Sequence, residues 1–194
     1  MNKIARPIVW VLGFAIALVA IYTAAFGIID EIYQRSITVA VSVILSIFAT
    51  PLAGLYQSDK KHIKAGQWAV DFILIFLMAL SILWFSSVYD ELESGLYSFL
   101  PIDIAVGCGG LIVVIEMTRR CFGTPLAFFA VLTIVYALFG ADLPWIFAHG
   151  GYDLESVMRT VWYSFDGVFG FIVIIVISLI FIFIIFGTVL DSGE

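Results

Sequence analysis

Apolar residues occur in six long runs along the chain, separated by short segments that hold most of the charged residues. A helix needs about 20 apolar residues to cross the ~30 Å hydrocarbon core of a bilayer. The pattern therefore predicts six transmembrane helices, and we expect the second to extend back toward Asp30. They cover residues 7–26, 37–55, 68–88, 102–117, 125–139 and 169–190.

The composition excludes a water-soluble fold. Of the 194 residues, 63% are hydrophobic and only 12% are charged, whereas soluble domains carry about 25% charged residues. The nine Lys and Arg residues are scattered, which argues against nucleic acid as a partner. We therefore expect an all-α integral membrane protein whose first partner is the lipid bilayer.

The basic residues predict the orientation of these helices. Lys3 and Arg6 precede the first helix, three lysines lie in the link 57–64, and Arg119 and Arg120 follow the fourth helix. If all six helices span, these basic sites share one side, and acidic residues dominate the opposite loops. Because cytoplasmic loops are enriched in Lys and Arg, both termini are expected in the cytoplasm of a multi-pass inner-membrane protein.

The long link between the fifth and sixth helices holds an amphipathic stretch. Asp153 is a candidate N-cap after Gly150 and Gly151. The apolar residues that share one helical face are Leu154, Val157, Met158, Val161, Trp162 and Phe165. This pattern favours a helix lying along the outer, periplasmic membrane surface; the alternative is a loop that packs on the protein.

The chain contains no recognisable catalytic motif. It lacks His-Glu-x-x-His, Cys-x-x-Cys and Gly-x-Ser-x-Gly. In the predicted topology His62 and His149 lie on opposite sides of the membrane and cannot share a metal ion. Cys108 and Cys121 make no motif. We therefore expect no catalytic, substrate-binding or metal-binding residue here, and no cofactor.

Ionisable residues inside membranes are functional candidates by default. All of those in this chain lie near helix ends, which favours structural pairing. Glu116 precedes two arginines by three and four residues, a spacing that puts opposite charges on one helical face. Ala105 and Gly109 form a small face that permits close helix packing. The candidate structural or interface residues are Arg35, Asp71, Asp103, Gly109, Glu116, Arg119 and Arg120.

A series of short motifs in the second half of the chain resembles a known family. The motifs are Ile115-Glu-Met-Thr-Arg-Arg-Cys-Phe-Gly123, Tyr136, Phe139-Gly140, Leu143-Pro144, His149-Gly-Gly-Tyr152, Asp166-Gly-Val-Phe-Gly170, Phe186-Gly187 and Ser192-Gly193. In this order and spacing they resemble the fused permease subunits of TRAP transporters (tripartite ATP-independent periplasmic transporters) of the TAXI type. Residues 1–101 resemble that family less specifically, through Tyr22, Phe26-Gly27, Arg35, Pro51 and Asp71.

The resemblance implies a division of the chain and a function. Residues 1–123 would form a small four-helix scaffold domain, and residues 124–194 would be the first helices of a large transport domain. The complete transporter would take up organic acids with a sodium gradient in the bacterial inner membrane, after delivery by a periplasmic substrate-binding protein. The substrate and sodium sites would lie outside this segment.

Two other functions stay open. In the first, the chain would be a stand-alone accessory or assembly subunit without a transport role. In the second, it would be an intramembrane enzyme that uses Asp71, Asp103 or Glu116. The absence of charge near the membrane midplane favours the scaffold over both.

Overall fold

The structure is a computed structural model that describes residues 5–27, 30–52, 61–144 and 147–191. Within these ranges the chain is helical and has no strand. The elements in chain order are α1 (Ala5–Phe26), α2 (Glu31–Ala49), α4 (Lys61–Glu93), α5 (Pro101–Phe122), α6 (Thr124–Phe139), a short 3-10 turn η1 (Gly140–Asp142), α7 (Leu154–Val161), α8 (Phe171–Ile175), a π-helical turn η3 (Val176–Ile180) and α9 (Phe181–Asp191).

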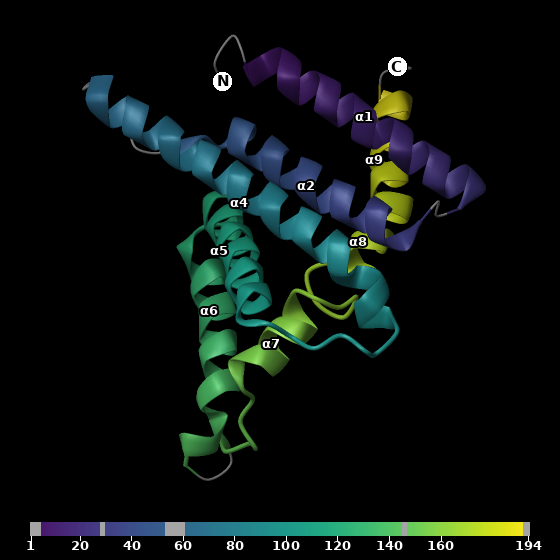
Figure 1. The fold of residues 1–194 in the computed structure, drawn as a ribbon. Helices are drawn as coiled ribbons and strands as arrows, with labels where there is room; N and C mark the ends of the chain where they lie inside the picture. Colours follow the sequence, from purple (N-terminus) through teal and green to yellow (C-terminus); the bar gives the residue numbers. More distant parts are fainter. Residues whose placement is uncertain (1–4, 28–29, 53–60, 145–146, 192–194) are drawn as a thin grey trace.

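Six helical segments of the described residues are long and apolar enough to cross a membrane, which confirms the all-helical prediction and the expected number of long apolar helices. The sixth, which we call the last span, is the continuous run Phe171–Asp191 through α8, η3 and α9. Figure 1 shows that α1, α2 and α4 lie beside one another, while α5, α6 and α9 cross them at a large angle.

The helix boundaries differ from the prediction for local reasons. α2 ends at Ala49 instead of continuing to residue 55, because Thr50 precedes Pro51 and has the non-helical angles φ −124° and ψ 62°. α5 continues through Phe122, so the two arginines of its last turn are helical. Gly123, with φ 92°, then allows the sharp break before α6.

Acidic side chains cap the starts of α2 and α5. The Asp30 carboxylate accepts a hydrogen bond from the Ile32 amide (3.1 Å) at the start of α2. At the start of α5, Pro101 occupies the first turn and the Asp103 carboxylate accepts from the Leu100 amide (2.6 Å). These caps satisfy backbone donors that the helix itself leaves unpaired.

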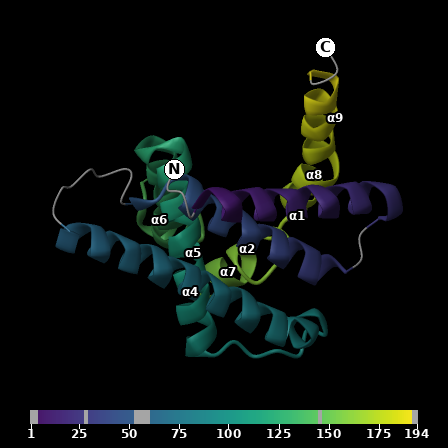
Figure 2. The ribbon, with the colours of Figure 1, turned by 90° about the horizontal axis from the view of Figure 1, so that it is seen from above.

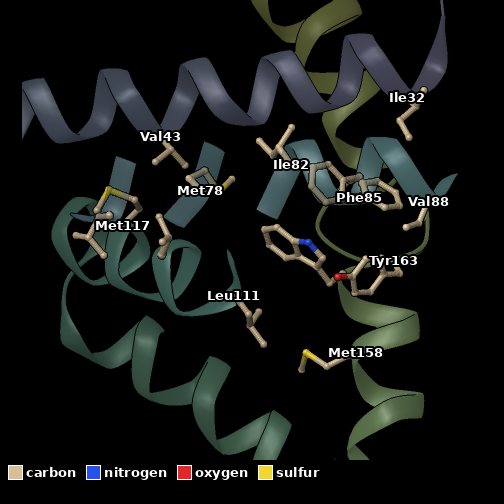
Figure 3. Packing of buried hydrophobic residues seen from close by; sticks show 14 of the residues in the cluster. Ile32, Val43, Met78, Ile82, Phe85, Val88, Leu111, Met117, Met158 and Tyr163 are labelled. Carbon is tan, nitrogen blue, oxygen red and sulfur yellow. The ribbon is translucent and has the colours of Figure 1, made fainter. Parts of the chain in front are cut away.

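A single buried cluster joins α2, α4, α5, α7 and the turn that follows α7 (Figure 3). It takes residues from both sides of position 123, the expected domain boundary. Its members are Ile32, Val43, Ile47, Leu74, Met78, Ile82, Phe85, Val88, Leu111, Val113, Met117, Val157, Met158, Trp162, Tyr163 and Phe169. α7 therefore turns its apolar residues Val157 and Met158 toward the protein interior.

Trp162 is the largest fully buried side chain, and it lies directly on α5. A Cβ placed on Gly110 would lie 2.1 Å from Cζ2 of Trp162, and one on Gly107 would lie 3.1 Å from Cε2 of Tyr163. The small face that α5 uses for close packing is thus formed by Gly107 and Gly110. Gly109 faces α4, where a Cβ would lie 3.7 Å from Leu77.

We expect Gly110→Ala to destabilise the protein and Gly109→Ala to be tolerated. The new methyl group at residue 110 overlaps the Trp162 ring, and overpacking of this kind costs about 1–3 kcal/mol. At residue 109 the methyl meets ordinary van der Waals contacts, and removing a helical glycine is worth roughly 0.5–1 kcal/mol in the other direction. Thermal unfolding of both variants in the same detergent measures the difference; equal melting temperatures would contradict this packing.

Candidate functional site

Four of the seven candidate residues come together at one end of α4 and α5. Arg120 donates from Nη1 to Oδ1 of Asp71 (2.5 Å) and from Nε to Oε1 of Glu116 (2.7 Å). Arg119 donates from Nε to Oε2 of Glu116 (2.7 Å). We call these four residues the inner network. Its two carboxylates balance its two guanidinium groups, so it has no net formal charge.

The Arg120–Asp71 pair of the inner network is buried, Glu116 and Arg119 are partly exposed, and the network joins three segments. The side chains of Arg120 and Asp71 are 0% and 2% exposed. Oδ2 of Asp71 also accepts a hydrogen bond from the Leu52 amide (3.2 Å), just after α2. The Asp71 carboxylate therefore ties the end of the second span to the third and, through Arg120, to the fourth. Burying these charges is tolerable because each meets an opposite charge with good geometry.

Asp103 lies at the opposite end of α5 and is fully buried. Its carboxylate accepts from Trp84 Nε1 (2.6 Å) and from the Tyr97 hydroxyl (2.9 Å), in addition to the Leu100 amide. Its backbone carbonyl accepts from the Tyr163 hydroxyl (2.8 Å). Burial and the hydrogen bond to Asp103 raise the pKa of Tyr97 from its usual 10.0 to about 12. Tyr97 thus stays a donor at every physiological pH.

Arg35 lies near the start of α2 and contacts the turn that leads into the last span. Nη1 donates to the Phe169 carbonyl (2.9 Å), and the guanidinium carbon lies 4.1 Å from the centre of the Phe165 ring. Nη2 pairs with Glu31 (3.0 Å), which is half exposed. Glu31 and Arg35, four residues apart, thus pair on one helical face, and the arginine also has a long-range partner.

The motif residues after α6 build a compact cap on that helix. The His149 ring lies against Gly140, where a Cβ would be 1.7 Å from Nε2. Nδ1 accepts from the Gly151 amide (3.1 Å), which assigns the proton to Nε2, and Nε2 donates to the Tyr136 carbonyl (3.0 Å). The Tyr152 amide donates to the Ala137 carbonyl (3.0 Å). His149 therefore has a local structural role.

The two polar clusters lie near opposite ends of α5. The rise of α5 from Asp103 to Glu116 is about 20 Å at 1.5 Å per residue. Within the described ranges no group of three His, Cys, Asp or Glu side chains gathers in a way that could hold a metal ion. The hydrogen bonds and the ion pair of the clusters join helices to one another, so this arrangement can hold the helices in position.

An apolar groove of about 290 Å³ runs between α2, α5 and the last span. On α2 it is lined by Thr38, Ser42 and Ser46, which recur every fourth residue and so share one face. Its remaining lining residues are Val39, Val43, Val114, Met117, Thr118, Cys121, Phe122, Val168, Ile172, Val173 and Val176.

Sequence reasoning selected the charged residues but missed several of their partners. Trp84 and Tyr97 hold Asp103, and nothing in the hydrophobic pattern marks them. The contact between Asp71 and Arg120 joins residues 49 positions apart, which no spacing rule within one helix could reveal. The Pro101-x-Asp103 pattern, a proline in the first turn followed by an acid, was the available signal for a helix start.

Comparison with family models, with curated proteins and with solved structures finds no match to this chain.

We expect Arg120→Met to lose about 3–5 kcal/mol of stability, because it leaves the Asp71 carboxylate buried without its cation. The double variant Asp71→Leu/Arg120→Met should recover much of this loss, since no uncompensated charge remains between those two positions. Thermal unfolding in detergent measures both.

Arg159→Met is the matched control for this prediction. Arg159 also pairs with a glutamate four residues away (Glu155, 3.3 Å), but both side chains are about half exposed, and such pairs contribute roughly 0–1 kcal/mol. A double variant as unstable as Arg120→Met alone would show that the lost stability does not come from the unpaired carboxylate.

Proposed function

We propose that this chain is the membrane scaffold part of a tripartite secondary transporter that depends on a periplasmic binding protein and takes up organic acids with a sodium gradient. The observation that carries the proposal is the distribution of polar groups. The inner network and the Asp103 cluster fix the two ends of α4 and α5, and the buried cluster between them is apolar. A scaffold that holds other helices in position in lipid requires polar contacts at its helix ends and an apolar interior between them.

The motif series that resembles TRAP permeases supports the same proposal. By that resemblance, residues 1–123 belong to the small domain and residues 124–194 begin the large one. The buried cluster extends this view, because Trp162, Tyr163 and Phe169 pack against α4 and α5. We infer that the segment up to Gly170 is held with the scaffold. Sodium ions and the organic acid would bind outside residues 1–194.

We infer that the inner network faces the bacterial cytoplasm. In Figure 1, α1 begins and α9 ends on the same side of the molecule. α4 begins at Lys61 and α5 ends with two arginines, and basic residues near span ends favour the cytoplasm. Trp84, Tyr89 and Tyr97 lie toward the opposite ends of the same helices, as expected of side chains at a membrane interface.

On this orientation α7 lies at the periplasmic side. Its buried face covers the start of α5, and its polar residues Glu155 and Arg159 are on the outside. The acidic residues Asp90, Glu91 and Glu93 end α4 on the same side. We propose that this face receives the substrate-binding protein.

The orientation predicts the reactivity of introduced cysteines. In the Cys108→Ala/Cys121→Ala background, Ser94→Cys should react with a membrane-impermeant maleimide in intact spheroplasts, because Ser94 is exposed in the link after α4. Ser58→Cys, in the lysine-rich link, should react only after permeabilisation. Ser58 lies outside the described residues and is chosen from the sequence. The reverse pattern would exclude the proposed orientation.

The function predicts sodium-driven uptake by the assembled system. Proteoliposomes that contain this chain with its transport domain and binding protein should accumulate radiolabelled succinate, pyruvate or glutamate under an inward sodium gradient. Accumulation should stop when an ionophore dissipates the gradient or when the binding protein is omitted. Absence of sodium-dependent uptake of every acid tested would refute the proposal.

The same preparation separates the scaffold from an accessory subunit. If the chain is only an assembly factor, its deletion lowers the abundance of the transport domain but leaves the uptake rate per remaining complex unchanged. For a scaffold we expect the rate per complex to fall as well, because the transport domain loses the surface that holds it.

A further inference from the structure

The turn between α7 and the last span is built on two glycines. The Val168 amide donates to the Val161 carbonyl (2.8 Å), which closes the turn. A Cβ on Gly167 would lie 2.1 Å from that same carbonyl oxygen, and one on Gly170 would lie 2.7 Å from the Gly167 carbonyl oxygen. The chain can therefore fold back this tightly only with glycine at both positions.

One cation holds this turn at both ends. Arg35 reaches it from α2, with its guanidinium group over the Phe165 ring at the beginning and its Nη1 on the Phe169 carbonyl at the end. Glu31 fixes the other nitrogen, Nη2. We call Arg35 and Glu31 the clamp. Because Gly170 is the N-cap of α8, the clamp acts two residues before the last span begins.

Beyond the turn, the last span has little support from the rest of the protein. None of its described side chains is buried. It contacts α2 through α8, and α1 through η3 and α9. Figure 2 shows α9 projecting away from the layer formed by α2 and α4. The direction of the span therefore depends strongly on how it leaves the turn.

The groove beside the start of the span has room for a closer arrangement. Its α2 wall carries Thr38, Ser42 and Ser46, whose small side chains allow helix backbones to approach closely in lipid. The Thr38 hydroxyl already donates to the Gln34 carbonyl (2.8 Å) and the Ser46 hydroxyl to the Ser42 carbonyl (2.8 Å). An apolar helix that packs on this wall therefore leaves neither of these two hydroxyl groups without a hydrogen-bond acceptor.

We propose that the turn Gly167–Gly170 is a hinge and that Arg35 is the positioning residue that sets its angle. With the clamp formed, the last span crosses α1 and the groove stays open. With the clamp released, the span pivots toward α5 and closes the groove. Phe169 keeps the pivot in place, because its ring stacks on Phe85 (4.8 Å between centroids) and meets Trp162 edge-on (5.1 Å). This inference does not depend on the proposed transport function.

Spin-label distances in lipid nanodiscs test the proposal. One label is attached to native Cys121, which is exposed and lines the groove on α5. The second is attached to Phe183→Cys on the last span, where the native side chain is 64% exposed, and Cys108→Ala removes the other thiol. Double electron–electron resonance then gives the distribution of distances between the two helices.

We expect Arg35→Met to shift the main distance between the two labels to shorter values. The last span would then approach α5 toward the axis separation of packed helices, which is about 8–10 Å. Glu31→Gln should give a smaller shift in the same direction, because it weakens the clamp without removing the guanidinium. Since Glu31 is half exposed, this variant gives a result even if Arg35→Met fails to fold.

Arg159→Met is the matched control, since Arg159 also pairs with a glutamate four residues away and lies over a phenylalanine ring (Phe99, 4.3 Å). It touches neither the turn nor the last span in those contacts, and its distance distribution should equal that of the unmodified protein. If Arg35 only stabilised the fold, Arg35→Met would lower the melting temperature without changing the distance between the labels. Unchanged distances in both clamp variants would overturn the proposal.

Discussion

The buried ion pair between Arg120 and Asp71 is the interaction on which the arrangement of the second, third and fourth apolar helices depends. A charge inside a membrane protein is tolerated only where an opposite charge or a set of hydrogen bonds meets it. Arg120 cannot lose its charge, so Asp71 must stay beside it. That requirement fixes the rotation of α4 against α5, and the Leu52 amide on the same carboxylate extends the constraint to α2.

The packing of Trp162 on Gly110 plays the corresponding part for the second half of the chain. An indole ring fits against a helix backbone only where no side chain intervenes, and α5 provides that surface at Gly107 and Gly110. Because Trp162 follows α7 directly, its position carries α7 and the turn after it into the core. The ion pair thus acts near the end of α5 and the ring on its middle, and α5 is the element that both halves share.

The six long apolar helices could be predicted from the sequence because hydrophobic length is a local property that lipid imposes on each segment separately. Helix ends were harder to predict, although Pro51 and Pro101 marked two of them. Most contacts of the candidate residues could not be predicted from the sequence. Glu116 could be paired with Arg119 and Arg120 from their spacing, but the partner of Asp71 depends on which faces of two helices meet. Similarly, Gly109 was selected for close packing and does face α4, but the tightest approach of another side chain to α5 is that of Trp162 to Gly110, which depends on where Trp162 arrives.

Several of the motif residues on which the family resemblance rests have geometric roles in this structure, whereas Ser192 and Gly193 lie outside the described residues. Gly140, His149 and Gly151 form the cap of α6, and Gly167 and Gly170 form the turn before the last span. An ion or substrate site would instead need polar groups whose lone pairs are free for a ligand. A series of turn-forming residues in fixed order preserves the directions in which spans leave the bundle. Preserved direction is what the proposed scaffold must supply, since a transport domain in lipid can be held only through the positions of the helices that contact it.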